Sequence, residues 1–166
     1  MRDFTPEAFA AFLGEAALAV EHRTRSALEE AARIVEHEAK AEIGHYQEQA
    51  GPFVPWAELA DATKDDRVRQ GFTENDPGLR SGTMRDSINH RVDGSEAHIG
   101  SDDQNLVYFE LGTDKQPPRT VLAGALIRKT DEVVETLGRR FVASLTGDGV
   151  ANGALPLDGE RWEIGM

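Results

Sequence analysis

Residues 6–46, PEAFAAFLGEAALAVEHRTRSALEEAARIVEHEAKAEIGHY, are the most regular part of the chain. Apolar residues recur there at steps of three and four, which places them on one face of an α-helix. Eleven of these 41 residues are alanine, the best helix former. Thr5 and Pro6 supply an N-cap hydroxyl and a proline at the first helical position. The stretch therefore predicts a helix over 6–46. Its apolar stripe consists of Phe9, Phe12, Leu13, Ala16, Val20, Ala27, Leu28, Ala31, Val35 and Ala39.

A continuous helix over 6–46 would be about 60 Å long at 1.5 Å per residue. That is too long for a compact domain in a chain of 166 residues. We therefore expect the helix either to break near Thr24–Ser26 or to project and meet a partner. Acidic and basic residues four apart predict ion pairs on its exposed side. These pairs are Glu21 with Arg25, Glu29 with Arg33, and Glu36 with Lys40.

Residues 87–100 carry the clearest β pattern. Ile88, His90 and Val92 alternate with polar residues, and Asp93-Gly94 is a typical hairpin turn. Upstream, Gly51-Pro52 and Pro55 end the helical region, a short charged helix follows through Gln70, and residues 71–78 are rich in loop-forming residues. Downstream, residues 106–111 predict a short helix closed by Gly112. A second apolar stripe predicts a long helix over 121–146.

Together these segments predict an α+β fold, in which long N-terminal and C-terminal helices pack on a small antiparallel sheet that contains the 87–100 hairpin. We expect one domain over residues 1–146, with its motif-bearing core in 56–146. Residues 147–166 contain five glycines and few anchors, so we expect a flexible C-terminal arm there. Only Leu155, Leu157, Trp162 and Ile164 in this arm are suited to docking.

Composition narrows the function. The 30 acidic residues outnumber the 18 basic ones, giving a net charge of −12, which argues against tight binding to DNA or anionic lipid. The absence of cysteine excludes disulfides, thiol nucleophiles and thiolate metal sites. No segment matches a secretion signal or a membrane helix. We expect a protein that folds in a cytoplasm and has no membrane partner.

Catalytic and metal patterns are weak. His37 and His45 lie eight apart on the first helix, whereas metal-binding helices use spacings of three or four, so a solvated polar face is the better interpretation. His90 and His98 could face each other across the hairpin, either as a small hydrolase site or as ordinary cross-strand pairing. No nucleophile elbow or phosphate-binding loop occurs. We therefore predict no catalytic residues, no bound metal and no cofactor.

Four segments carry a family resemblance. They are Trp56-x-x-Leu59-x-x-x-Thr63; residues 79–88, LRSGTMRDSI, containing Gly82 and Ile88; the hairpin; and Tyr108-Phe109-Glu110-Leu111-Gly112-Thr113 followed by Pro117-Pro118-Arg119. In type and order they resemble segments of the tailed-bacteriophage neck and tail-completion family, which includes minor tail and virion-morphogenesis proteins. The resemblance covers roughly residues 56–145. Where the family usually continues with proline and an aromatic residue, this chain has Thr120 and Val121.

This resemblance implies a structural virion protein without catalysis. Such a protein would sit at the head–tail junction as a hexameric or dodecameric ring. It would join the head connector or stopper to the tail terminator or tail tube, with DNA passing through but not tightly bound. The implied assembly contacts are Trp56, Leu59, Gly82, Ile88, Tyr108, Glu110, Gly112, Thr113, Pro118 and Arg119, joined by Trp162 and Ile164 of the arm. The alternative is an acidic DNA mimic that inhibits a DNA-binding protein.

Overall fold

The computed structural model of the protein describes residues 5–146, apart from the side chains of Ala16 and residues 144–146. Its elements are α1 (Pro6–Glu42), α2 (Asp61–Arg69), α3 (Thr83–Asp86), β1 (Ile88–Asp93), β2 (Glu96–Ser101), α4 (Gln104–Leu111), α5 (Leu122–Arg128) and α6 (Thr130–Thr146). The expected C-terminal arm, with Trp162 and Ile164, lies outside this range.

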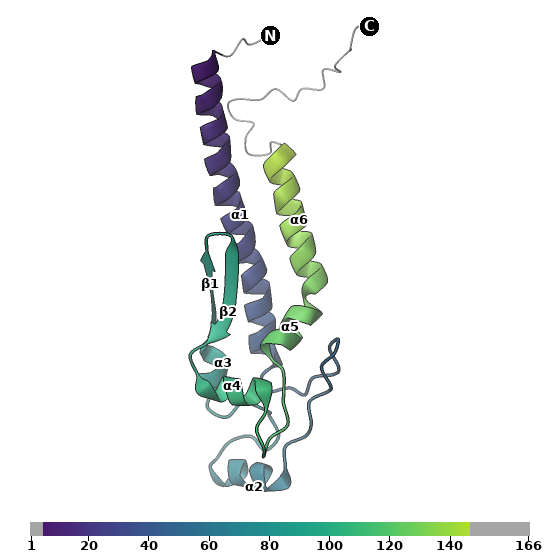
Figure 1. Cartoon of the computed structure of the whole chain (residues 1–166). Helices are drawn as coiled ribbons and strands as arrows, with labels where there is room; N and C mark the ends of the chain where they lie inside the picture. The colour runs from purple at the N-terminus through teal and green to yellow at the C-terminus, as the bar shows by residue number, and fades with distance from the viewer. Residues whose placement is uncertain (1–4, 147–166) are drawn as a thin grey trace.

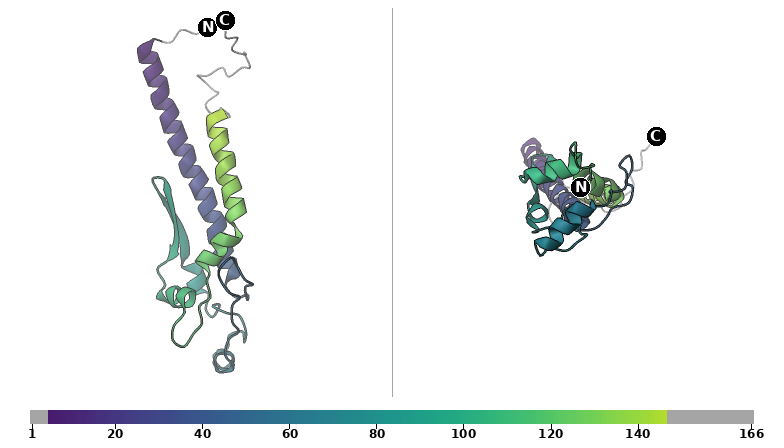
Figure 2. Two further views of the ribbon diagram at one scale, coloured as in Figure 1. Left: turned by 45° about the vertical axis from the view of Figure 1, so that its right-hand side comes forward. Right: turned by 90° about the horizontal axis from the view of Figure 1, so that it is seen from below.

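The molecule is elongated, and α1 forms its axis (Figure 1). Helix α6 runs antiparallel to α1 along one side, and the β1–β2 hairpin lies along another side of α1 (Figure 2). The short helices and loops gather at the C-terminal end of α1. This arrangement confirms the predicted α+β class, with long terminal helices and a small antiparallel sheet.

Helix α1 is continuous, so the predicted break near Thr24–Ser26 does not occur. The Thr5 hydroxyl accepts a hydrogen bond from the N–H of Ala8, as expected of an N-cap. The helix ends at Glu42 and not at residue 46. Ile43 is extended, and Gly44 has a φ of 103° and donates its N–H to the carbonyl of Pro77. The N-terminal part of α1 continues past the end of α6 (Figure 1).

The hairpin forms as predicted, but its two-residue loop is Gly94-Ser95, one position later than expected. The register pairs His90 with Ile99 and Arg91 with His98. Directly paired residues share a face of an antiparallel ladder, and neighbours along a strand point to opposite faces. His90 and His98 therefore lie on opposite faces, and the expectation that they face each other is wrong.

The predicted helix over 121–146 is interrupted. Helix α5 ends at Arg128, Lys129 leaves helical geometry with φ −100° and ψ 6°, and α6 begins at Thr130. The Thr130 hydroxyl donates to the carbonyl of Leu126 four residues earlier, a bond that often bends helices. The bend lets α5 cross the end of α1 while α6 runs alongside it (Figure 2).

The core lies at the C-terminal end of α1, not along its whole length. Its buried members are Val35, Ala39, Ile43, Trp56, Ile88, Leu106, Phe109, Val121 and Ala125. Farther toward the N-terminus, only small residues of α1 are buried, namely Ala27, Ala31 and Ala32. The core therefore draws on the second half of α1, the segment before α2, β1, α4 and the start of α5, and leaves the first turns of α1 outside it.

Candidate functional site

Residues from two of the four resembling segments, the first and the last, meet in one place beside the core. This motif cluster consists of Trp56, Phe109, Glu110, Gly112, Pro118 and Arg119. It joins the segment before α2, the end of α4 and the loop 112–121 that leads into α5 (Figure 1). The sequence placed these residues far apart, and the fold brings them into contact.

Trp56 is a packing residue of this cluster. Its ring meets that of Phe109 edge to face, with centroids 5.3 Å apart at 84°. Its indole N–H donates to the carbonyl of Thr120 at 3.3 Å. Only 6% of Trp56 is exposed, so a partner could reach little of it. Its role is to tie the loop 112–121 to the core.

Arg119 is buried although no carboxylate pairs with it within residues 5–146. Its guanidinium donates to the carbonyl of Ala57 at 2.7 and 3.0 Å and to that of Glu58 at 3.2 Å. It also lies 5.6 Å from the centroid of the Phe109 ring. The charge is thus stabilised by backbone dipoles and an aromatic face, and in return it fixes the backbone that follows Trp56.

Glu110 and Gly112 shape the start of α5. The Glu110 carboxylate accepts hydrogen bonds from the N–H groups of Val121, Leu122 and Ala123 at 2.6, 2.9 and 3.1 Å. N–H groups at the start of a helix have no acceptor within the helix, so the carboxylate satisfies them. Its negative charge also interacts favourably with the positive end of the helix dipole. Gly112 ends α4 with a φ of 76°, which confirms it as the predicted cap of this helix.

The remaining candidates are dispersed. Ile88 is fully buried in the core, and Leu59 donates its N–H to the Tyr46 hydroxyl. Gly82 has a φ of 87° and precedes α3 as its N-cap. Thr113 pairs with Gln116 in a tight loop. Tyr108 is 47% exposed, and its hydroxyl accepts a bond from Gln104, so it is an accessible candidate contact.

Two buried charges were missed by the sequence analysis. Glu42 is 2% exposed and pairs with Arg128 through one oxygen, while its other oxygen has no hydrogen-bond partner among the described residues. Burial raises the pKa of Glu42 to about 7, although Arg128 opposes this shift. Arg67 is equally buried and donates to the carbonyls of Thr73 and Leu79. Glu42 and Arg67 each bind to residues outside their own helix, and the periodicity of the sequence does not relate such residues to one another.

His90 packs the hairpin onto α1. Its Nε2 lies 3.0 Å from a carboxylate oxygen of Glu29, and its Nδ1 contacts Glu36. Burial disfavours the charged form of Glu36, but hydrogen bonds from Lys40 and His90 outweigh it and hold the pKa of Glu36 below its usual value. The predicted Glu36–Lys40 pair forms, whereas Glu29 bonds to His90 instead of Arg33 because the hairpin covers that side of α1.

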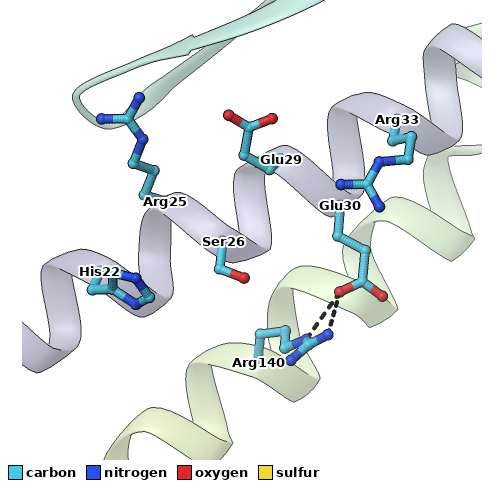
Figure 3. A pocket seen from close by; sticks show the side chains of 7 residues that line it. All are labelled: His22, Arg25, Ser26, Glu29, Glu30, Arg33 and Arg140. Carbon is cyan, nitrogen blue, oxygen red and sulfur yellow. Dashed lines mark hydrogen bonds and ion pairs between the residues drawn. The ribbon is translucent and has the colours of Figure 1, made fainter.

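A basic hollow lies between α1 and α6 (Figure 3). It has a volume of about 510 Å³ and is lined by His22, Arg25, Ser26, Glu29, Glu30, Arg33 and Arg140. Arg140 crosses from α6 to Glu30 on α1 at 2.6 Å. Over residues 5–146, neither Arg25 nor Arg33 forms an ion pair, so the predicted pairing of Arg25 with Glu21 is also wrong.

Two general properties complete the description. Among the residues described, no helix is both long and apolar enough to cross a bilayer. In the same part of the chain, no group of three or more His, Asp and Glu side chains is arranged to hold a metal ion.

Comparison with known proteins gives no match to a family model, to a curated protein or to a solved structure. The resemblance to neck and tail-completion proteins thus rests on the four segments themselves and stays a prediction.

Proposed function

We propose that this chain is a structural subunit of the head–tail junction of a tailed phage or a phage-derived particle. In this role it forms a six- or twelve-fold ring between the head connector and the tail tube and catalyses no reaction. It assembles in the host cytoplasm and is a component of the finished virion. The proposal starts from the four resembling segments, which occur in the expected order along residues 56–145.

The motif cluster gives two of those segments, the one that begins at Trp56 and the one over residues 108–119, a shared structural role. Arg119 and Trp56 bond to the backbone on opposite sides of the cluster, and Glu110 holds the first turn of α5. In all three residues the polar group of the side chain is used in hydrogen bonds within the protein. They hold the loop 112–121 in one shape, which is what a subunit with fixed neighbours requires.

The observation that carries the proposal is the exposed apolar surface on the first third of α1. Phe9 is 50% exposed and Leu13 is 51% exposed, and their spacing of four places them on one face of a helix that continues past α6 (Figure 1). Leu18, 68% exposed, adds apolar surface on another side of the same helix. Burying one leucine contributes about 1.5–3 kcal/mol, so a second helix packed on this surface would gain stability quickly. Repeating such a contact by rotation closes a ring.

The net charge of −12 suits a channel for DNA. An acidic wall repels phosphate and lets a genome slide past it, whereas a basic wall would retain it. If the assembled ring presented a basic lumen, this part of the proposal would be wrong.

The test is electron microscopy of purified particles with gold-labelled antibodies against this chain. We expect label at the head–tail junction, seen only in particles that have a tail attached. An antibody against the major head protein is the matched control, since it should label the whole head. Absence of label, with the epitope shown to be accessible, would reject the virion role and favour the DNA-mimic alternative.

A further inference from the structure

An apolar groove lies between α1 and α6 and reaches Ser95 in the hairpin loop. Its volume is about 440 Å³, within the range of about 300–1,000 Å³ that ligand sites usually have. Its apolar lining consists of Ala27, Leu28, Val134, Leu137, Gly138 and Phe141. Val134 is 62% exposed and Gly138 leaves open space where a side chain would stand. The groove is therefore shaped to accept a large apolar side chain.

The rim of the groove is basic in a chain that is strongly acidic. The groove is lined by two charged residues, Arg23 and Arg140, and both are basic; they form its arginine rim. Arg140 pairs with Glu30, whereas Arg23 donates only to the carbonyl of Ala143 among the described residues. An occupant with acidic residues beside its apolar anchors would match this surface in both charge and polarity.

Residues 147–166 of this same chain have that composition. The segment carries four acidic residues against one basic residue, while its apolar anchors include Leu157, Trp162 and Ile164. Asp158, Glu160 and Glu163 alternate closely with those anchors. Trp162 is also the residue type most often found as an anchor in a pocket.

The segment also starts in the right place. It follows Thr146 at the end of α6, and the groove residues Val134–Phe141 lie five to twelve positions before that point. Along a helix this is roughly 8–18 Å at 1.5 Å per residue. Trp162 lies sixteen positions after Thr146, and an extended chain of that length spans up to about 50 Å. Trp162 can thus turn back and reach the groove of its own chain.

We propose that residues 155–164 bind in the groove between α1 and α6 of the same chain, with Trp162 in the apolar part and the acidic residues against the arginine rim. This gives the C-terminal segment a specific site and does not depend on the proposed function. Before assembly, the segment covers apolar surface that would otherwise be open to unspecific contacts.

The test uses engineered cysteines in the full chain, which has none of its own. Ser95, at the groove, and Gly165 are replaced together (Ser95→Cys, Gly165→Cys). The control pairs Gly165→Cys with Asp65→Cys, an exposed position on α2 at the other end of the molecule. Disulfide exchange with glutathione then gives the effective concentration of the two thiols. We expect at least a tenfold higher value for the groove pair than for the control.

Two further changes identify the contact. Gly138→Leu puts an apolar side chain into the groove at a position where a Cβ meets nothing within 4 Å, and leucine favours the helix. We expect Gly138→Leu, and separately Trp162→Ala, to reduce the groove pair to the value of the control. Equal values for the two original pairs would overturn the proposal. So would a groove pair that forms only between chains and increases with protein concentration.

Discussion

Gly112 shows how a single residue determines the shape of the loop 112–121. Its φ is 76°, and a Cβ there would lie 2.7 Å from the Pro118 nitrogen and 2.8 Å from the Gln116 carbonyl oxygen. Both of these are backbone atoms, so neither can rotate away as the end of a flexible side chain can. We expect Gly112→Ala to lower the free energy of unfolding by about 2–4 kcal/mol, measured by urea denaturation.

Gly138→Ala is the matched control for this substitution. Gly138 lies within α6 and has open space around its Cβ position, so alanine should raise the stability by about 0.5–1 kcal/mol. A loss at Gly112 no larger than about 0.5 kcal/mol would show that the loop can relax around a side chain.

Glu42 makes stability depend on pH in a definite direction. Its pKa is about 7 in the folded protein against 4.5 for a free glutamate, so the folded state holds more protons between these values. The contribution of Glu42 to stability therefore falls as pH rises from about 4.5 to 7 and is constant above that. Glu42→Gln lacks this dependence. We expect the stability of the native protein relative to this variant to fall by about 1–3 kcal/mol between pH 5 and pH 8.

The measurement is chemical denaturation at several pH values, with Glu74→Gln at an exposed loop position as the control. The control should run parallel to the native protein across the range. A Glu42→Gln profile that is also parallel would contradict the shifted pKa.

At this scale the sequence was informative where a residue acts locally. Gly112 closes the helix just before it, so the pattern of a short apolar run followed by glycine sufficed to predict it. Glu42 and Arg67 could not be predicted in the same way. The partner of Glu42 is 86 positions away, and a buried carboxylate on a helix has the same local pattern as a solvated one.

Among the elements, α5 depends most clearly on one side chain. The Glu110 carboxylate accepts three backbone N–H groups at its start, and no side chain of the preceding residue Val121 can replace them. We expect Glu110→Ala to cost about 2–3 kcal/mol of stability, because buried donors are left without acceptors. Glu110→Gln keeps one acceptor oxygen and should cost less, so the order of the two variants in thermal unfolding tests the assignment.

Helix α1 is expected to have two regions of different stability. From Ala27 onward one face of α1 is buried against α6, the hairpin and α5, whereas Leu13 and Leu18 are largely exposed. Helical turns with little tertiary packing open easily. In the isolated chain, hydrogen exchange should be at least about 100-fold faster for amides of residues 13–18 than for residues 30–42. Uniform protection along α1 would contradict this expectation.

The elements themselves were largely predictable. Apolar steps of three and four gave α1, and strict alternation gave the hairpin, because each pattern extends over enough residues to outweigh local propensity. The interruption at Lys129 was not predictable, since no glycine or proline marks it. Beside the local bond of the Thr130 hydroxyl to the Leu126 carbonyl, Arg128 bonds there to Glu42 and to the backbone of Glu48, contacts that exist only in the folded chain.

For the whole molecule, the surface that would mediate assembly is at the opposite end from the motif cluster. Replacing Leu18, an exposed residue in the first third of α1, should therefore affect association and not folding. We expect Leu18→Asp to weaken self-association by at least tenfold, about 1.4 kcal/mol, in mass photometry, with little change in Tm. Val68→Asp, at an exposed position of α2, should change neither. Equal association of both variants would place the interface elsewhere.

The sequence indicated that α1 is too long for a compact domain and would either break or project. In the structure α1 is continuous, and its N-terminal part projects past the end of α6 (Figure 1). The basic surface between α1 and α6 was not foreseen. Arg25 and Arg33 were each expected to pair with a glutamate on the same helix. Glu29, the expected partner of Arg33, bonds to His90 instead. Glu21 and Arg25 form no ion pair within residues 5–146. Net charge averages over such local differences, so a chain of −12 still presents an arginine-rich face.

The antiparallel course of α1 and α6 gives each subunit a direction. The first turn of α1 and the last turn of α6 lie toward one end of the molecule, while the motif cluster and α2 lie at the opposite end (Figure 2). In a ring related by rotation alone, all subunits share this direction, so the ring has two chemically different rims. A head and a tail are different surfaces as well, and a ring with unlike rims can attach to them in only one orientation.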